Sequence, residues 1–498
     1  MQVISIFKSA ALIPTIYLSL LSFISLYSFH RLLMVWRLYK YRPIPSKSIK
    51  PCLDDQIPKV TIQLPIFNEM YVAERLIDAV SKLNYPQDKL EIQVLDDSVD
   101  ETQWLCTDKV AELHAQGYNI HYIHRDNRQG FKAGALAHGL QVASGELVMI
   151  FDADFIPQSD TLLKMVGHFS DPDIAMVQAR WGHINRHYSG LTEIQALMLD
   201  GHFMIEQIAR YHSGCFFNFN GTAGMWRVSA IDDAGGWQHT TLTEDLDLSY
   251  RAQLRDWRFV YLPEVVVPAE LPMEMNSFKS QQYRWAKGSS QVAKNLLAPV
   301  LNSHLPIYVK FEALLHLTNN FNYLLLLFLL VLSLPYQIYI DQHKWTWELY
   351  VYLPIFLITS FNLLCYYGVS QREQGLFKNP WKFGAHLILL MSVGVGLAVN
   401  QSLAVCDGLL KTGADFVRTP KHGVVNRTER WSRKRYSTAK TWVIYLELAM
   451  LVYLLLTFVF ALQHAHYLSL PFLAMFCLGY MYILGLSFWH GSTQVTPG

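Results

Sequence analysis

The sequence predicts an α/β domain of Rossmann-like build that is joined to a membrane by apolar helices. Strand and helix patterns alternate from Val60 to about Arg258, and repeated βα units form a mostly parallel sheet. Apolar runs of about 20 residues, the length of a membrane span, occur on both sides of this region. The chain is 51% hydrophobic with a mean hydropathy of +0.15, which is too apolar for an ordinary soluble protein.

Composition and charge exclude several other classes of protein. The 498 residues are enough for two or three domains, and 41 Lys and Arg against 40 Asp and Glu leave a net charge of +1. No nucleic-acid partner is expected from this balance. The six cysteines are scattered without a C-x-x-C pair, so neither a zinc site nor a disulfide framework is indicated.

The first apolar run, from Ala11 to Phe29, predicts a membrane anchor within residues 1–50. Basic residues follow it from Arg31 to Lys50, and the positive-inside rule places this flank in the cytoplasm. A cleaved signal peptide is the alternative. It is disfavoured because the strong positive charge follows the apolar run and no A-x-A-like cleavage site is present.

Residues 51–280 are predicted to form the α/β domain, whose first half has clear elements. Strands are expected at Val60–Ile66, Leu90–Leu95, Ile120–His124 and Leu147–Phe151, with helices at Met70–Leu83, Thr102–Ala115 and Lys132–Val142 between them. Ligands of such sheets bind beyond the carboxyl ends of the strands. Polar residues that follow the strands are therefore the candidates for a site.

Two carboxylate clusters are predicted to lie together at this edge. Asp96 and Asp97 follow the second strand, and the D-x-D pair of Asp152 and Asp154 follows the fourth. In such a pair, Asp152 would brace a nucleotide sugar and Asp154 would hold Mg²⁺ or Mn²⁺ on a diphosphate. A turn or a helix cap is the alternative for any single pair, but two clusters at one edge favour a site.

Further candidates follow other strands. No G-x-G-x-x-G follows the first strand, where Asn68 and Glu69 stand instead, so a dinucleotide redox cofactor is not expected. Lys132 opens a helix, where a cation and backbone N–H groups favour phosphate. Glu244 and Asp245 precede a helical stretch and are the catalytic candidates, with Asp245 as a general base. A helix cap is the alternative for this run.

The boundary between the α/β domain and the C-terminal region carries the motif Gln281-x-x-Arg284-Trp285. It offers an amide, a guanidinium fork and a flat apolar ring within about one and a half turns of helix. These groups suit a sugar diphosphate, because hydroxyls bond to amides and a pyranose face stacks on an indole. The alternative is an amphipathic helix at a membrane surface. Residues 281–317 are predicted to hold this motif and interfacial helices.

Residues 318–498 are predicted to form the membrane region. Runs of span length are Asn319–Ile340, Tyr350–Tyr367, Trp442–Leu462 and Leu468–Phe488. A further run, Phe383–Val405, has basic segments on both sides, so we interpret residues 383–405 as interfacial or re-entrant. One span before the α/β domain and four after it would place the N-terminus outside and the C-terminus inside.

Taken in order, the motifs resemble those of a known family. The acids at 96–97, 152–154 and 244–245 followed by Q-x-x-R-W are typical of the processive membrane glycosyltransferases of family 2, the cellulose synthase superfamily. Longer strings resemble the plant cellulose-synthase-like glucomannan and xyloglucan-backbone synthases and their bacterial relatives. These strings are Gln93-Val-Leu-Asp-Asp-Ser98, Arg125-Asp-Asn-Arg128, Lys132-Ala-Gly-Ala-Leu136 and Phe219-Asn-Gly-Thr-Ala-Gly224. The resemblance covers roughly Lys59 to the C-terminus.

The resemblance implies a GT-A catalytic fold and a role for each motif. Asp97, with Asp96 and Asp152, would hold the nucleotide, Asp154 the metal and Lys132 the diphosphate. Asp245 would be the base and Trp285 would form the floor of the acceptor site. Residues 412–425 resemble the family's F-x-V-T-x-K gating loop, with Arg418 in place of the Val and with Thr419 and Lys421 available to the diphosphate. The family's interfacial helix before this loop agrees with the interpretation of residues 383–405.

The implied function is processive, inverting transfer of glucose or mannose to a growing β-1,4-linked polysaccharide, with export through the membrane helices. UDP-glucose is the favoured donor and GDP-mannose the other. The catalytic domain would be cytoplasmic, at a bacterial inner membrane or at a eukaryotic Golgi or plasma membrane. One alternative is a non-processive enzyme that glycosylates a lipid such as ceramide or diacylglycerol. Another is an inactive export scaffold, which the intact acids disfavour.

Overall fold

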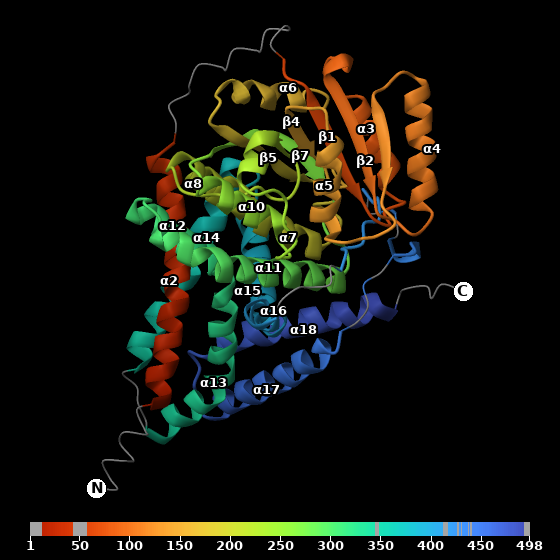
Figure 1. Ribbon diagram of the computed structural model, residues 1–498. Helices are drawn as coiled ribbons and strands as arrows, with labels where there is room; N and C mark the ends of the chain where they lie inside the picture. Colours follow the sequence, from red (N-terminus) through yellow and green to blue (C-terminus); the bar gives the residue numbers. More distant parts are fainter. Residues whose placement is uncertain are drawn as a thin grey trace.

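The computed structural model describes residues 12–42, 57–343, 348–411, 417–425, 428–429, 431–436, 438 and 441–492. An α/β domain lies at one end of the molecule and long apolar helices lie at the other (Figure 1). Helix α11 (Met275–Asn302) lies across the boundary between the two parts. The predicted start of the first apolar run at Ala11 and the first residues of the gating-like loop, 412–416, fall outside the described residues.

Seven strands form one mixed sheet in the order β3-β2-β1-β4-β6-β5-β7. Their bounds are β1 Val60–Ile66, β2 Leu90–Asp96, β3 Ile120–His124, β4 Leu147–Ile150, β5 Ile174–His183, β6 Gly224–Arg227 and β7 Arg258–Ala269. Strands β1 to β4 pair in parallel, as do β5 and β7, whereas β6 runs antiparallel to both of its neighbours. The predicted mostly parallel sheet is therefore confirmed, with one reversed strand that the sequence patterns did not indicate.

The first half of the sheet is built from βα units, as predicted. Helices α3 (Ala73–Ser81), α4 (Thr102–Ala115) and α5 (Phe131–Val142) follow the first three strands. Every residue of β2 and β4 is buried, which is typical of parallel strands covered on both faces. Helix α3 is shorter than the predicted Met70–Leu83, because the chain makes a turn after β1 before the helix begins.

The second half is less regular. It contains α6 (Thr161–Val166), α7 (Gly190–Gly201), the π-helical segment η4 (His202–Glu206), α8 (Gln207–His212), α9 (Val228–Asp233) and α10 (Glu244–Gln253). Short 3₁₀ turns occur at η2 (Gln87–Lys89), η3 (Gly167–Ser170), η5 (Asn319–Phe321) and η6 (Trp431–Arg433). Helix α12 (Ile307–Leu317) follows α11 and leads into the apolar helices.

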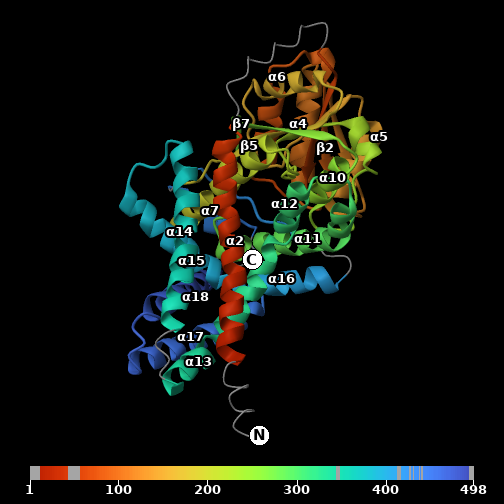
Figure 2. The ribbon, with the colours of Figure 1, turned by 90° about the vertical axis from the view of Figure 1, so that its left-hand side faces the viewer.

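Five helices in the described part of the chain are long and apolar enough to cross a membrane. The candidate spans are Leu12–Lys40 in α2, Asn319–His343 in η5 and α13, Tyr352–Glu373 in α14, Val443–Gln463 in α17 and Leu470–Gly491 in α18. The helices themselves are α2 (Leu12–Lys40), α13 (Asn322–His343), α14 (Glu348–Glu373), α17 (Val443–Gln463) and α18 (Leu470–Ser492). Figure 2 shows α2 running beside α13 and α14.

The segment predicted to be interfacial or re-entrant forms a bent pair of helices. Helix α15 (Pro380–Gly396) and helix α16 (Ala398–Leu410) meet at an angle of 49°, and the pair counts as a sixth span only if it is one broken helix. Helix α16 packs along α11. The bend thus places the second half of this segment under the helix that carries Q-x-x-R-W.

Helix α2 extends beyond the predicted end of its apolar run. The helix continues from Phe29 to Lys40, so Arg31 and Arg37 belong to it. Arg37 is 6% exposed and donates from Nη1 to Glu312 Oε2 of α12 at 2.9 Å. At least part of the predicted basic flank is therefore folded against the protein.

Candidate active site

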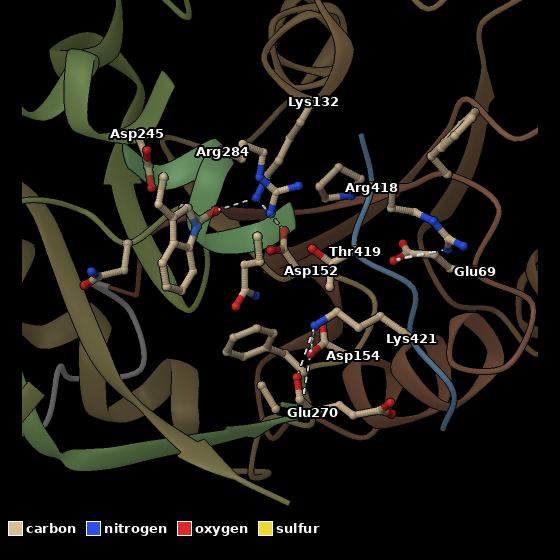
Figure 3. A pocket seen from close by; sticks show the side chains of 18 of the residues that line it. Glu69, Lys132, Asp152, Asp154, Asp245, Glu270, Arg284, Arg418, Thr419 and Lys421 are labelled. Carbon is tan, nitrogen blue, oxygen red and sulfur yellow. Dashed lines mark hydrogen bonds and ion pairs between the residues drawn. The ribbon is translucent and has the colours of Figure 1, made fainter. Parts of the chain in front are cut away.

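A large pocket opens at the carboxyl ends of β1, β2 and β4, at the edge predicted to bind ligands. Figure 3 shows side chains from both halves of the chain pointing into it. The predicted site residues that line it are Glu69, Asp97, Lys132, Asp152, Asp154, Glu244, Asp245, Gln281, Arg284, Trp285, Thr419 and Lys421. Asn68 and Asp96 are the two predicted residues that do not line the pocket.

These two residues have other contacts in the structure. Asp96 is fully buried at the end of β2, where Tyr122 Oη donates to Oδ2 at 2.8 Å and the Ser98 N–H donates to Oδ1 at 3.1 Å. Asn68 has a positive φ of 52° and its Oδ1 accepts from the Val99 N–H at 2.9 Å. Both support the loops after β1 and β2 rather than facing the pocket, because their polar groups are already bonded within the protein.

Aromatic and cationic side chains line the end of the pocket near β1 and β2. Arg125 donates from Nε to Asp97 Oδ1 at 2.7 Å and also contacts Asp97 Oδ2 through Nη2, a two-point pair. The guanidinium carbon of Arg128 lies 3.4 Å from the ring centroid of Phe67. Asp97, Arg128 and Phe67 all line the pocket. A flat ring beside a guanidinium and a carboxylate suits the base and ribose of a nucleotide.

Lys132 and Asp152 form an ion pair at the centre of the pocket. Lys132 Nζ lies 2.5 Å from Asp152 Oδ1 and donates to the Gly221 carbonyl at 2.8 Å. Burial alone would lower the pKa of Lys132, but the carboxylates of Asp152 and Glu244 raise it above its ordinary value. The prediction that Lys132 opens a helix is confirmed, since α5 begins at Phe131. A persistent cation therefore lies where a phosphate can be bound.

Asp154 is bonded to the loop that follows α16. Lys421 Nζ lies 2.7 Å from Asp154 Oδ2, and the Glu270 N–H donates to the same oxygen at 2.9 Å. The side chain of Glu270 in turn accepts from the backbone N–H groups of His422 and Gly423, each at 2.8 Å. Figure 3 shows Lys421 pointing towards Asp154 and Glu270. The loop is thus fixed over the end of β4.

The carboxylates can hold a divalent ion only together with a substrate. Among the described residues, no group of three or more His, Cys, Asp and Glu side chains is arranged to bind a metal on its own. Mg²⁺ and Mn²⁺ do not require such a cage, since one or two carboxylates plus phosphate oxygens and waters suffice. Asp152 and Asp154 provide those carboxylates in the pocket. The donor set fits the predicted ion when a diphosphate supplies the remaining oxygens.

Arg418 and Thr419 approach the pocket from the same loop. Arg418 donates to the Asn68 carbonyl, and its Nη1 lies 3.7 Å from Glu69 Oε1. Burial raises the pKa of Glu69 to about 7 in spite of this guanidinium. The Thr419 hydroxyl is buried, and no described residue is hydrogen-bonded to it. An unpartnered hydroxyl in the pocket lining is a candidate contact for a phosphate oxygen.

Glu244 and Asp245 occupy the first turn of α10. The predicted helix begins here, but the Thr243 side chain makes no capping bond. Burial and the neighbouring carboxyl of Glu244 raise the pKa of Asp245 to about 7, although the Leu246 N–H donates to Asp245 Oδ1 at 2.8 Å. Burial also raises the pKa of Glu244. A carboxyl that changes charge near neutral pH is suited to accept a proton in a reaction.

The Q-x-x-R-W motif lies within α11, in the stretch that faces the pocket. Arg284 donates from Nη1 to the Val417 carbonyl at 3.2 Å, so this helix also contacts the loop that carries Lys421. A Cβ on Gly288, one turn further on, would lie 2.5 Å from Thr243 Cγ2. The glycine thus permits close packing of α11 against the start of α10, which brings Trp285 and Asp245 to one pocket.

Several lining residues were not among the site residues predicted from the sequence. Arg128, Trp181, His183, Asn220 and Glu270 all line the pocket. Arg128 and Asn220 belong to the strings Arg125-Asp-Asn-Arg128 and Phe219-Asn-Gly-Thr-Ala-Gly224, which were a usable signal. Trp181 and His183 are on β5 and Glu270 follows β7, and neither strand was predicted. His183, a lone histidine without a metal-ligand spacing in the sequence, lies in the pocket lining.

The fold and the pocket define a class of protein. Residues 58–288 match the family described as Glycosyltransferase like family 2. Among solved structures, the mannosyltransferase PcManGT from Pyrobaculum calidifontis, in complex with GDP-Man and Mn2+, gives a TM-score of 0.51 at 19% identity. The match covers 80% of this chain and 99% of that one. The α/β domain therefore has a glycosyltransferase fold of the GT-A type.

Curated relatives narrow this class. Glucomannan 4-beta-mannosyltransferase 2 of Arabidopsis thaliana is 41% identical over 278 residues, covering 54% of this chain and 52% of the relative. Probable glucomannan 4-beta-mannosyltransferase 9 of Oryza sativa subsp. japonica is 38% identical over 379 residues. This match covers 74% of this chain and 69% of the relative. The chain spans about half the length of the Arabidopsis relative. It belongs to this family of cellulose synthase-like, family 2 glycosyltransferases.

Proposed function

We propose that the protein is a membrane-bound, inverting hexosyltransferase that transfers mannose from GDP-mannose to the 4-hydroxyl of a β-1,4-linked polysaccharide. The observation that carries this proposal is the pocket itself. It brings Asp245, with a pKa of about 7, together with the lysine-paired acids Asp152 and Asp154 and with Trp285 of α11. The family relatives support the same reaction class.

In this proposal Asp245 removes the proton from the acceptor hydroxyl as that oxygen attacks the anomeric carbon. The pKa of about 7 leaves much of the carboxyl deprotonated at neutral pH and still basic enough to take the proton. Glu244 keeps that pKa high through repulsion between the two carboxylates. One displacement with one base inverts the configuration at the anomeric carbon.

The leaving nucleoside diphosphate is stabilised by cations from three elements. Lys132 of α5, Arg284 of α11 and Lys421 of the loop after α16 all line the pocket. Each offsets negative charge that grows on the diphosphate as the sugar leaves, and such groups contribute several kcal/mol, roughly 3–4 each, at a transition state. A Mg²⁺ or Mn²⁺ ion held by Asp152 and Asp154 would neutralise the same phosphate oxygens.

The donor preference drawn from the sequence is revised. UDP-glucose was favoured, but the curated relatives are named as mannosyltransferases, and nothing in the comparisons supports UDP-glucose. Both donors carry the same diphosphate, so the lysines and acids of the pocket do not distinguish them. GDP-mannose is therefore the proposed donor, and it rests on the relatives.

Processive synthesis and export are also part of the proposal. Trp285 lies on α11, which packs against α16 and α18 of the apolar region. A sugar stacked on that indole would stand between the proposed base and the membrane helices. The growing polysaccharide would leave through those helices, and the α/β domain would face the cytoplasm, where nucleotide sugars are made.

The test is incorporation of radiolabel from GDP-mannose and, separately, from UDP-glucose by purified full-length protein with Mg²⁺ or Mn²⁺. We expect a long polymer from GDP-mannose that β-1,4-mannanase degrades and that Asp245→Asn does not make. Polymer made only from UDP-glucose would show that the donor is UDP-glucose and not GDP-mannose. Label found only in organic-extractable glycolipid would overturn the polysaccharide acceptor.

A further inference from the structure

The loop that lines the pocket beside Asp245 is connected by side-chain contacts to the first apolar helix. Asn220 and Gly221 of this loop line the pocket. Gly221 has φ +82°, and a Cβ there would lie 3.0 Å from Asp245 Oδ2. The loop therefore lies directly against the proposed base, and Asn220 lines the same pocket.

Hydrogen bonds fix the orientation of the Asn220 amide. Gln207 Nε2 donates to the backbone carbonyl of Asn218 at 2.9 Å, and since a carbonyl can only accept, the NH₂ group of Gln207 faces this loop. The same Nε2 lies 2.7 Å from Asn220 Oδ1, which must then be the oxygen of that amide. The Asn220 NH₂ group consequently faces His202, with its Nδ2 3.0 Å from His202 Nε2.

The same logic fixes the tautomer of His202. Because Asn220 Nδ2 donates, His202 Nε2 accepts and carries no proton. The proton of the neutral ring is then on Nδ1, which lies 3.3 Å from Glu206 Oε2. His202 and Glu206 are the first and last residues of the π-helical segment η4. Single π-helical turns inside helices often occur at functional sites.

Glu206 is held by charged and polar groups from other elements. Arg210 Nη1 lies 3.3 Å from Glu206 Oε2, and Tyr366 of α14 donates to Oε1 at 3.0 Å. Arg210 Nε also donates to Glu312 Oε1 at 3.0 Å, and Glu312 binds Arg37 of α2. The series from Asn220 to α2 is thus continuous, so contacts with α12 and α2 support the orientation of the Asn220 amide.

We propose that Asn220 is a sugar-binding residue and that His202 is the positioning residue that orients it. An asparagine amide has two N–H bonds, so one remains after the bond to His202, and no other described residue is recorded as accepting it. That N–H donates to a hydroxyl of the acceptor hexose, next to the hydroxyl that Asp245 deprotonates. The inference rests on the proposed function for the identity of the acceptor.

Two substitutions of His202 distinguish the roles of its two ring nitrogens. Glutamine places its amide oxygen near the position of Nε2 and can still accept from Asn220, whereas asparagine reaches only the position of Nδ1. We expect His202→Asn to lower kcat/KM for a β-1,4-mannohexaose acceptor at least about tenfold, and His202→Gln to stay within about threefold of wild type. His212→Asn, in α8 but outside the network, is the control. A structural role alone would make both His202 variants equally poor.

A double-mutant cycle tests whether His202 acts through Asn220. Adding His202→Asn to Asn220→Ala should change kcat/KM by less than about twofold, because the group that His202 orients is already gone. If the two losses multiply instead, the positioning role is overturned.

Binding tests the inference without turnover. Mannohexaose binding, followed by tryptophan fluorescence in full-length protein, should weaken at least about tenfold in Asn220→Ala. Unchanged binding would overturn the sugar contact. Absence of mannosyl transfer by the wild-type protein would overturn the proposed function alone, since the binding measurement still decides the contact.

Discussion

Two groups of buried acids in this chain have opposite electrostatic settings. In the pocket, burial and the carboxyl of Glu244 raise the pKa of Asp245 to about 7. Near the cytoplasm-facing end proposed for α2, burial alone would raise the pKa of Glu312, but His30, Arg210 and Arg37 lower it to about 2. Glu312 is fully buried, whereas Asp245 is partly exposed in the pocket. They differ in how many cations contact them.

The difference separates the carboxyl of the proposed base from a structural carboxyl. Glu312 accepts from Arg37 at 2.9 Å and from Arg210 at 3.0 Å, so its charge is compensated at both oxygens. Asp245 accepts a backbone N–H and has no such ion pair among the described residues. A fully paired carboxylate has little tendency to take a proton, whereas Asp245 can exchange one near neutral pH.

The largest expected effect comes from removing the reactive acid. Asp245→Asn keeps the shape of the side chain but removes the base, so we expect kcat to fall about 10²- to 10⁴-fold. Turnover of GDP-mannose by purified protein measures the loss. Asp233→Asn, a surface acid paired with Arg255, is the matched control and should remain active. An Asp245→Asn enzyme with more than about a tenth of wild-type turnover would contradict the assignment.

Breaking the structural cluster around Glu312 should lower the stability of the protein. Arg210→Met leaves Glu206 and Glu312 buried with fewer cations, and loss of one partner of a buried pair costs about 3–5 kcal/mol. Chemical unfolding in detergent measures the change. Arg258→Met removes an exposed pair with Asp171 and should cost less than about 1 kcal/mol. Equal losses of unfolding free energy in the two variants would contradict the structural role of the buried ion pairs.

Removing the contact between Lys421 and Asp154 should have an intermediate effect, on the KM for the donor. Lys421→Met removes a cation from the diphosphate site and should raise KM for the donor about tenfold, with a smaller change in acceptor KM. Initial rates at varied donor and acceptor concentrations separate the two constants. Lys164→Met, which breaks an exposed pair on α6, serves as the control. A Lys421→Met enzyme with unchanged donor KM would remove Lys421 from the diphosphate site.

The pH dependence sharpens the comparison further. Asp245 is protonated below its pKa of about 7 and active above it, so kcat/KM should rise about tenfold per pH unit below pH 7 and then level off. Glu69 has a similar pKa of about 7, so the profile is measured in Glu69→Gln as well. The rising limb should persist in that variant. Its disappearance would assign the limb to Glu69.

The smallest expected effect is a gain in stability. A carboxyl whose pKa is higher in the folded state destabilises the fold as pH rises from its ordinary value of 3.8 towards about 7. Asp245→Asn removes this cost, so its unfolding free energy should exceed that of wild type by about 1–2 kcal/mol at pH 7. The gap should close near pH 4. A constant gap at all pH values would assign it to another cause.

The sequence predicted most of the first half of the sheet and most of the acidic and basic side chains that line the pocket. Buried apolar runs such as that of β1 specify strands locally, and an acid directly after a strand must lie at the sheet edge. Asp96 shows the limit of this rule. It was predicted to follow its strand and is the last residue of β2, but it is fully buried against Tyr122. Only the packing of β3 decides which of the two adjacent acids faces the pocket.

What the sequence determined by itself are the features with a local period: strands, helices, apolar runs and the residue types at their ends. Only the tertiary structure decided which charges meet. Lys421 reaches Asp154 across 267 positions, and Glu312 gathers His30, Arg37 and Arg210 from two distant segments. A charged side chain has no periodic signature in the sequence. The pKa of such a group depends on its burial and on the partners that packing brings to it. The same kind of carboxyl group is therefore the proposed base in the pocket and a member of buried ion pairs beside α2.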